Sequence, residues 1–224
     1  SNEDFSLDFD TLISKAKKLN PKIIFLCNPN NPTGYFIKTA EIKKLLKQIN
    51  SIIVVDEAYI DFAEGSIISE INNYKNLIVL RTFSKALGLA GLRLGYMATH
   101  KVIIQSINKV KSPYNLNTVT QQLAITALEN TDRIKDYIKE VKIERAFLYK
   151  ELLQLPLKVY ESRANFIFFK SHILNLNKYL EEYGILIRSF SKDLNNFYRV
   201  TIGSPEENKE FIKSIKEIYQ NENK

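Results

Sequence analysis

The sequence contains very few of the residues that form disulfides or zinc sites. Cys27 is the single cysteine among 224 residues, so the sequence predicts neither an internal disulfide nor a cysteine metal cluster. His100 and His172 are the two histidines, and two are too few for a plausible zinc site. We therefore expect the function of this chain to involve no metal ion.

Long hydrophobic runs are also missing. No apolar stretch is long enough to span a bilayer, and the N-terminus has no basic stretch followed by an apolar one. We therefore expect a soluble protein that is not secreted. Internal repeats, low-complexity linkers and a helix-turn-helix pattern are absent as well, which argues against a DNA-binding regulator.

The composition favours a globular protein with a well-filled core. Hydrophobic residues make up 45% of the chain, and its length allows one large or two modest domains. The formal net charge of +7, with pI ≈ 9.2, can indicate nucleic acid, a membrane surface or an anionic substrate as partner. The lysines alternate with apolar residues, however, as in Lys43–Lys47. We interpret the positive charge as solvated helix faces.

Short apolar runs in the first half predict buried strands at residues 22–26, 52–55 and 77–80, with a possible fourth at 92–98. Thr39 is expected to be the N-cap of an amphipathic helix between the first two strands. Strands separated by helices predict a parallel α/β sheet. In such sheets the functional residues lie at the carboxyl ends of the strands.

The pattern changes after Pro113. Residues 118–153 are polar and have a helical period, and beyond Pro156 short strands and helices predict an α+β module. Strands are expected around 165–169, 185–187 and 197–202, and helices near 174–183 and 206–219. We expect the domain boundary inside the long helical stretch, with residues 1–130 in a larger domain and 131–224 in a smaller C-terminal one.

A lysine stands just beyond the third predicted strand. Residues 82–93 read TFSKALGLAGLR, so hydroxyl groups, small residues and an arginine surround Lys85. Glycines let a backbone approach a ligand closely, and hydroxyls with backbone amides suit a phosphate. Arg93 adds a cationic fork for the same phosphate. The same pattern also fits a glycine-rich structural turn with a surface lysine.

A second motif, DEAY at residues 56–59, follows the strand at 52–55. A buried carboxylate such as that of Asp56 needs a cationic partner. A protonated pyridine nitrogen of a cofactor would be one, and the pair would hold the ring as an electron sink. Tyr59 is placed to donate to an oxygen of the same ring. The alternative is a strand-end aspartate that caps the next turn.

The third motif is the loop NPNNPTG at residues 28–34. Its prolines fix the backbone, so an asparagine side chain can be held towards a ligand. The alternative is a rigid turn without further function. Each motif by itself is of moderate specificity, but the three in this order are highly specific.

The segments NPNNPTG, DEAY and TFSKALGLAGLRLGY resemble the fold-type-I pyridoxal-phosphate (PLP) aminotransferases, and among them most of all the histidinol-phosphate aminotransferases. The resemblance runs over essentially the whole chain, including RVTIG at residues 199–203. It implies an α/β fold of the PLP-transferase type I, with a large domain on a mainly parallel sheet, incomplete here, and a small C-terminal α+β domain. It also implies a cytoplasmic homodimer with no nucleic-acid or membrane partner.

The resemblance implies pyridoxal 5'-phosphate as cofactor and gives a role to each motif residue. Lys85 would form the Schiff base and later carry the proton at the substrate carbon. Asp56 would pair with the pyridine nitrogen, and Asn31 and Tyr59 would hydrogen-bond the ring oxygen. The residues implied to hold the cofactor phosphate are Thr82, Ser84 and Arg93.

The C-terminal module is implied to bind the substrate. Arg199 matches the arginine that family members use on the substrate's anionic group. Arg188 resembles a second arginine that the histidinol-phosphate enzymes use on the substrate phosphate, although it could also be an exposed strand-end cation. Asn165 resembles a residue that lines the site. The implied reaction is transamination of histidinol phosphate with 2-oxoglutarate, giving glutamate, in histidine biosynthesis.

Other functions keep the same cofactor residues. An aromatic-amino-acid aminotransferase or a threonine-phosphate decarboxylase would carry the three motifs, and a PLP-fold remnant without activity is a further alternative. The family's chains begin well before the residue that is Ser1 here. The earlier part normally supplies a glycine-rich phosphate loop, an aromatic residue stacked on the cofactor ring and a tyrosine that reaches the partner subunit's cofactor. We therefore expect this chain to be a fragment or a truncated product.

Overall fold

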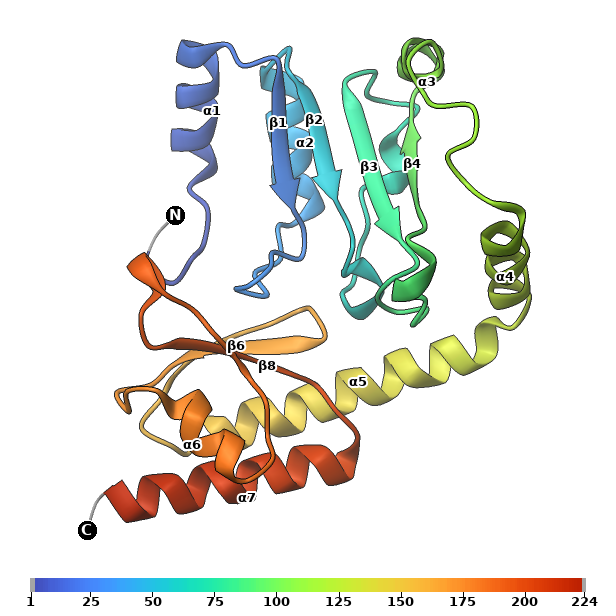
Figure 1. The fold of residues 1–224 in the computed structure, drawn as a ribbon. Helices are drawn as coiled ribbons and strands as arrows, with labels where there is room; N and C mark the ends of the chain where they lie inside the picture. The colour runs from blue at the N-terminus through green and yellow to red at the C-terminus, as the bar shows by residue number, and fades with distance from the viewer. Residues whose placement is uncertain (1–2, 223–224) are drawn as a thin grey trace. The chain divides into compact units, whose positions relative to one another are not determined.

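The computed structural model describes residues 3–222, which form two compact units (Figure 1). Unit 1 comprises the residues up to Asn30 and Phe36–Asp136, and unit 2 comprises Asn31–Tyr35 and the residues from Tyr137 on. Among the described residues, no helix combines the length and the apolar character needed to cross a membrane.

A four-stranded sheet forms the centre of unit 1, with strand order β1-β2-β3-β4. Strands β1 (Ile23–Cys27), β2 (Ile52–Asp56) and β3 (Leu77–Thr82) are parallel, and β4 (Gly95–Thr99) pairs antiparallel with β3. The predicted, mainly parallel α/β sheet is therefore confirmed. The fourth strand begins later than expected, because Ala90–Leu92 form a 3₁₀ turn before it.

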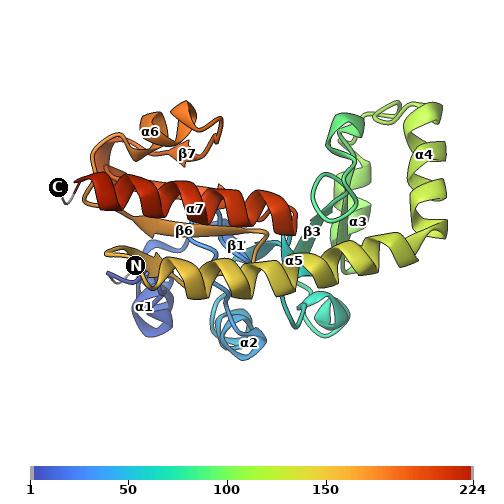
Figure 2. The same cartoon turned by 90° about the horizontal axis from the view of Figure 1, so that it is seen from below.

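Helices α1 (Phe9–Leu19) and α2 (Thr39–Gln48) lie on the same side of this sheet (Figure 2). The apolar face of α2 is buried as its periodicity predicts. The predicted N-cap, Thr39, is wrong by one position. Thr39 is the first helical residue and Lys38 is the cap, with its backbone N–H donating to Glu41 Oε2 at 3.1 Å.

The predicted helical stretch at residues 118–153 is two helices. Helix α4 (Thr118–Glu129) ends at Asn130, whose Nδ2 donates to the Thr126 carbonyl at 2.7 Å, and α5 (Thr131–Leu152) starts directly after it. An asparagine side chain that binds the preceding turn competes with continued helix, which accounts for the break. Helix α3 (Lys101–Asn108) precedes this pair.

Unit 2 is built on a second four-stranded sheet, with order β5-β6-β8-β7 and antiparallel pairing throughout. Its strands are β5 (Lys158–Tyr160), β6 (Phe166–Lys170), β7 (Arg188–Ser189) and β8 (Phe197–Thr201). An α+β module in this part of the chain is therefore confirmed.

The predicted strand at 185–187 is wrong. Ile185 still donates its N–H to the carbonyl of Leu180 in helix α6 (Leu176–Glu182), at 2.9 Å. Strand pairing therefore begins only at Arg188.

Helix α7 (Pro205–Glu222) lies beside α5 along the second sheet (Figure 2). Lys216 Nζ lies 2.6 Å from Glu151 Oε2, and Asn208 Nδ2 donates to Glu144 Oε2 at 2.9 Å, so polar bonds join the two helices at separate points. The core between helices and sheet is apolar. Its fully buried members include Leu148, Leu152, Ile167, Phe169 and Ile215, and each such side chain stabilises the fold by roughly 1.5–3 kcal/mol.

Candidate active site

Asp56 is the last residue of β2, between Cys27 of β1 and Leu80 of β3 in the register of the sheet. Its Oδ1 accepts a hydrogen bond from the Ala58 N–H at 3.0 Å, so the carboxylate does cap the following turn. Two carboxylate oxygens offer about four acceptor positions. The capping bond therefore leaves the Asp56 carboxylate able to accept a further hydrogen bond from a ligand.

Tyr59 and Lys85 lie together in unit 1. The Lys85 Nζ is 5.1 Å from the centroid of the Tyr59 ring, within the range of a cation–π contact. Tyr59 is buried, with 7% of its surface exposed, and Lys85 is half-buried. The structure thus brings the amine that follows β3 close to the phenol that follows β2.

Thr82 and Arg93 frame the loop that carries Lys85. The Thr82 Oγ1 accepts from the Ser84 N–H at 3.1 Å and donates to the Leu94 carbonyl at 3.4 Å. Arg93 is exposed and has a φ of 51°, and its Nη1 donates to the Ala90 carbonyl at 3.1 Å. A guanidinium has five N–H donors in all. Thr82 therefore shapes the turn before Lys85, while Arg93 has further donors for an anion.

Asn28 is a structural residue of the site that sequence reasoning missed. It is 1% exposed, and its side chain both donates to the Ile37 carbonyl at 3.1 Å and accepts from the Ile37 N–H at 2.7 Å. Its own N–H donates to the Asp56 carbonyl at 2.8 Å. Asn28 therefore closes the loop on itself and ties it to the end of β2. The signal was its position as the first asparagine after an apolar strand, where an amide can replace a strand partner.

Arg199, on β8 in unit 2, contacts the loop asparagine Asn31. Its Nη1 donates to Asn31 Oδ1 at 2.5 Å, and its guanidinium carbon lies 4.9 Å from the centroid of the Phe166 ring. Among the described residues, Arg199 Nε is buried without a hydrogen-bond partner. A charged donor that is withdrawn from water and unpaired is costly, so it indicates a place for an acceptor from a ligand.

Arg188 is directly opposite Arg199 in the register of β7 and β8. Side chains opposite each other in an antiparallel pair point to the same face, with Cβ atoms about 4.5–5.5 Å apart, and like charges there repel. Arg188 is exposed, and its guanidinium carbon is 6.0 Å from the centroid of the Phe190 ring. The two arginines therefore form a cationic pair that an anion would stabilise.

The remaining predicted residue, Asn165, precedes β6. It is half-buried, and its carbonyl accepts from the Ile202 N–H at 2.9 Å, just after the strand that carries Arg199. Tyr198, the neighbour of Arg199, anchors this strand: its hydroxyl donates to the Ile173 carbonyl at 3.3 Å and accepts from the Leu176 N–H at 3.1 Å. Burial raises the pKa of Tyr198, so the anchor stays neutral.

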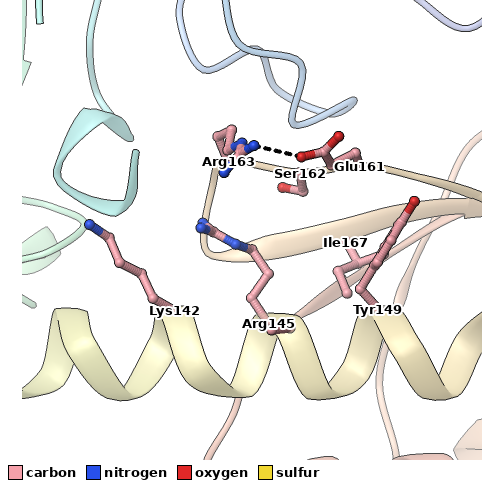
Figure 3. A pocket seen from close by; sticks show the side chains of 8 residues that line it. Lys142, Arg145, Tyr149, Glu161, Ser162, Arg163 and Ile167 are labelled. Atoms are coloured by element: carbon pink, nitrogen blue, oxygen red, sulfur yellow. Dashed lines mark ion pairs between the residues drawn. The ribbon is translucent and has the colours of Figure 1, made fainter. Parts of the chain in front are cut away.

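Unit 2 also has a cavity of about 280 Å³ between helix α5 and residues 161–163 (Figure 3). Figure 3 shows Lys142, Arg145 and Tyr149 pointing from the helix towards this space. Arg145 donates to the Ala164 carbonyl at 2.8 Å, which ties the helix to the segment opposite. None of the predicted site residues lines this cavity.

The side chains of unit 1 are those of an enzyme that uses a phosphorylated cofactor, and the comparison with known families agrees. The family described as "Aminotransferase class I and II" matches residues 1–215. The chain belongs to this family, whose members depend on PLP.

Among its relatives, the histidinol-phosphate aminotransferase of Thermoanaerobacter sp. (strain X514) is 46% identical over 220 residues, which are 96% of this chain and 62% of that protein. The crystal structure of the histidinol-phosphate aminotransferase from Clostridium acetobutylicum matches with a TM-score of 0.90 at 28% identity, covering 98% of this chain and 70% of that one. The L-threonine-O-3-phosphate decarboxylase from Porphyromonas gingivalis matches with a TM-score of 0.82 at 27% identity, covering 98% and 68%. The chain spans about 62% of the length of the curated relatives it matches.

The side chains of unit 1 fit PLP group by group. The cofactor has an aldehyde, a basic ring nitrogen, a ring oxygen and a phosphate. The chain offers an amine at Lys85, a carboxylate at Asp56 and a phenol at Tyr59, with the amine lying against the phenol. Ser84 and Arg93 add a hydroxyl and a guanidinium in the loop around the amine. Each cofactor group thus has a complementary side chain.

Proposed function

We propose that the protein to which this chain belongs transfers the amino group of histidinol phosphate to 2-oxoglutarate, with PLP as cofactor, in histidine biosynthesis. The curated relatives named histidinol-phosphate aminotransferase support this reaction at 40–46% identity over nearly the whole chain. The structural observation that carries the substrate class is the opposition of Arg188 and Arg199 on adjacent strands. We also propose a cytoplasmic homodimer, with residues 1–130 in the large domain and 131–224 in the small one.

In this proposal the side chains of unit 1 hold the cofactor. The Lys85 amine would hold its aldehyde group, the Asp56 carboxylate would pair with the ring nitrogen, and the Tyr59 hydroxyl would donate to the ring oxygen. The phosphate is bound by Thr82, Ser84 and Arg93. When bound, the cofactor supplies an electron sink for the charge that develops at the substrate's α-carbon.

Asn31 is proposed to share the ring oxygen with Tyr59. Because its Oδ1 already accepts from Arg199, its Nδ2 is the end of the amide that points a donor elsewhere. The bond to Arg199 therefore also fixes the orientation of the amide. This one contact connects a proposed cofactor ligand with a proposed substrate ligand.

Lys85 would act as the general base of the reaction. Its Nζ would hold and move the proton of the substrate's α-carbon, which is general acid–base catalysis by one positioned amine. The contact with the Tyr59 ring restricts the directions that the long lysine side chain can take. A restricted amine loses less entropy when it reaches the reacting carbon.

The arginine pair binds the substrate phosphate. A phosphate dianion can bridge two guanidiniums by charge-assisted hydrogen bonds, each worth about 1.5–3 kcal/mol. The buried Nε of Arg199 obtains an acceptor in this way. The half-buried Asn165 is proposed to line the same site.

A second candidate is the decarboxylation of threonine phosphate, because the decarboxylase from Porphyromonas gingivalis has the same fold and its substrate also carries a phosphate. The arginine pair suits both substrates, and the names of the curated relatives favour histidinol phosphate. An aromatic-amino-acid aminotransferase would have no phosphate to place between the arginines. An inactive remnant would bind no cofactor.

The test is a kinetic comparison on the full-length protein loaded with PLP. Histidinol phosphate and phenylalanine are each tested with 2-oxoglutarate as the amino-group acceptor. Threonine phosphate is tested for release of carbon dioxide. The proposal expects glutamate formation with histidinol phosphate as the best substrate. Faster turnover of phenylalanine would support the aromatic enzyme, and release of carbon dioxide from threonine phosphate would support the decarboxylase. A protein without the absorbance band of bound PLP would be the inactive remnant.

A further inference from the structure

A buried ion pair lies behind the cofactor residues of unit 1. The Glu57 side chain is 0% exposed and lies 2.8 Å, Oε2 to Nε, from Arg81, whose side chain is 15% exposed. Glu57 directly follows Asp56, and Arg81 lies on β3, four residues before Lys85. The pair therefore joins the two strand ends that carry the proposed cofactor ligands.

Arg81 connects three acceptors. Besides the bond from Nε to Glu57, its Nη1 donates to Asp61 Oδ1 at 3.3 Å and its Nη2 donates to Ser66 Oγ at 3.0 Å. Asp61 lies in the short 3₁₀ helix Ile60–Phe62 that follows Tyr59. Because a planar guanidinium presents its donors in a rigid fork, these bonds fix the segment around Tyr59 against β3.

Glu57 is satisfied from the other side as well. Its Oε1 accepts from the Ile67 N–H at 2.9 Å and its Oε2 accepts from the Ser66 hydroxyl at 2.6 Å. Its own N–H donates to the Leu80 carbonyl at 2.9 Å, which continues the bonding between β2 and β3 past Asp56. A fully bonded buried carboxylate has one stable arrangement, so the network holds these loops in a single position.

Successive residues of a strand point to opposite faces. Arg81 and Thr82 therefore leave β3 on opposite sides, and the Thr82 hydroxyl closes the turn towards Lys85 by accepting from the Ser84 N–H. The ion pair thus acts from the side away from that turn.

We propose that Glu57 and Arg81 are positioning residues, which hold the Asp56–Tyr59 turn and the Lys85 loop at the spacing that cofactor binding and proton transfer require. This inference rests on the proposed function for its meaning in catalysis. Loss of Arg81 leaves the buried Glu57 carboxylate without a cation, and loss of the Glu57 charge leaves Arg81 with Asp61 as its remaining carboxylate partner. Ser66 belongs to the same network, because its hydroxyl donates to Glu57 and accepts from Arg81.

The test uses the full-length protein with Glu57→Gln, Arg81→Lys and Ser66→Ala. The control is Glu70→Gln, which breaks another partly buried ion pair of unit 1, that of Lys43 and Glu70 at 2.6 Å. Hydrogen exchange of the cofactor-free protein should become roughly ten- to hundredfold faster in residues 56–60 and 82–92 of Glu57→Gln, since a hydrogen bond to a charged group is lost. Arg81→Lys keeps the charge but loses the fork, and it should show a smaller rise in the same two segments.

The loaded protein gives readouts that separate positioning from mere stability. We expect PLP to bind about tenfold more weakly, the pH midpoint of its visible band to move, and kcat to fall at least about tenfold with little change in KM. The PLP affinity, the pH midpoint and the kinetic constants are all measured at a temperature below the melting temperature of each variant. If Glu57→Gln lowers only the melting temperature, and exchange, PLP affinity and pH midpoint equal those of Glu70→Gln, the inference is wrong.

The proposed function and the role of the ion pair are tested by different measurements. A wild-type protein that binds PLP but does not accept histidinol phosphate would contradict the proposed substrate, while exchange, affinity and pH midpoint still decide the role of the ion pair. Should Glu57→Gln fail to fold, Arg81→Lys and Ser66→Ala decide it. Unchanged exchange in both segments of both variants would overturn the inference.

Discussion

Replacement of Arg188 by alanine tests the proposed substrate most directly. The substitution removes one of two arginines that lie opposite each other in the register of β7 and β8 and point to the same face of the sheet. A charge-assisted bond to phosphate is worth about 1.5–3 kcal/mol, so its loss should lower kcat/KM for histidinol phosphate roughly ten- to hundredfold. Because Arg188 is exposed, water screens its charge, and we expect the lower end, about tenfold.

The assay compares histidinol phosphate with histidinol, which carries a hydroxyl in place of the phosphate. The wild-type protein should prefer the phosphate by at least about a hundredfold in kcat/KM, because an uncharged group leaves both cations underpaired. Arg188→Ala should reduce this ratio about tenfold by slowing only the phosphorylated amine, and it should leave the PLP titration unchanged. Arg163→Ala is the matched control, since Arg163 is a surface arginine of the same unit, paired with Glu161 at 2.7 Å. An unchanged ratio in Arg188→Ala, or an equal fall in the control, would refute the phosphate site.

Further substitutions test the cofactor site and the fold. Lys85→Ala should abolish covalent attachment of PLP, because its Nζ is the amine that lies against Tyr59; a borohydride-reduced adduct on a peptide without residue 85 would contradict this. Asp56→Ala should keep the cofactor but lower kcat by roughly three orders of magnitude, and near-normal turnover would exclude the role. Arg93→Ala should weaken PLP binding about ten- to hundredfold with little effect at saturating cofactor, which an unchanged titration would disprove. The pKa of Glu151 lies below its ordinary 4.5, chiefly because Lys216 donates to the carboxylate. The bond between Lys216 and Glu151 therefore stabilises the folded state fully above pH 4.5, and this stabilisation is lost as the pH falls through the pKa of Glu151 in the folded protein. Denaturant melts should show Glu151→Gln less stable than wild type at neutral pH by less than about 1 kcal/mol, and a difference that grows on acidification would contradict the assignment.

The sequence was informative where a local pattern decides the structure. The strands at residues 22–26, 52–55 and 77–80 were predicted from apolar runs bounded by polar residues, and all three form. The expected burial holds for β2 and β3 but is wrong for β1, which stands at one end of the strand order of the sheet and leaves Ile23 and Phe25 exposed. The motif residues Asp56 and Lys85 could be placed at strand ends from the same apolar runs. Both lie at the same edge of the sheet because β1, β2 and β3 are parallel, and parallel strands end at one edge.

The sequence was uninformative where the partner is distant. Arg81 reads as one charged residue at the end of an apolar strand, and its network becomes visible only when Glu57, Asp61 and Ser66 are placed around it. The strand expected at 185–187 failed for a local reason: Ile185 still donates its N–H to Leu180 of helix α6, and strand pairing begins only at Arg188. A hydrogen bond that ends a helix can thus override the strand preference of the residues that follow it.

The short segment Asn31–Tyr35 belongs to unit 2, although the residues on both sides of it belong to unit 1. The Arg163 N–H donates to the Gly34 carbonyl at 2.9 Å, and a Cβ at Gly34 would collide with Ser162 Oγ. A protein cut before Tyr137 would therefore leave its C-terminal piece without the acceptors that Gly34 and Asn31 supply to Arg163 and Arg199. No single cleavage yields either unit whole, so a study of the C-terminal unit in isolation has to graft this segment onto it.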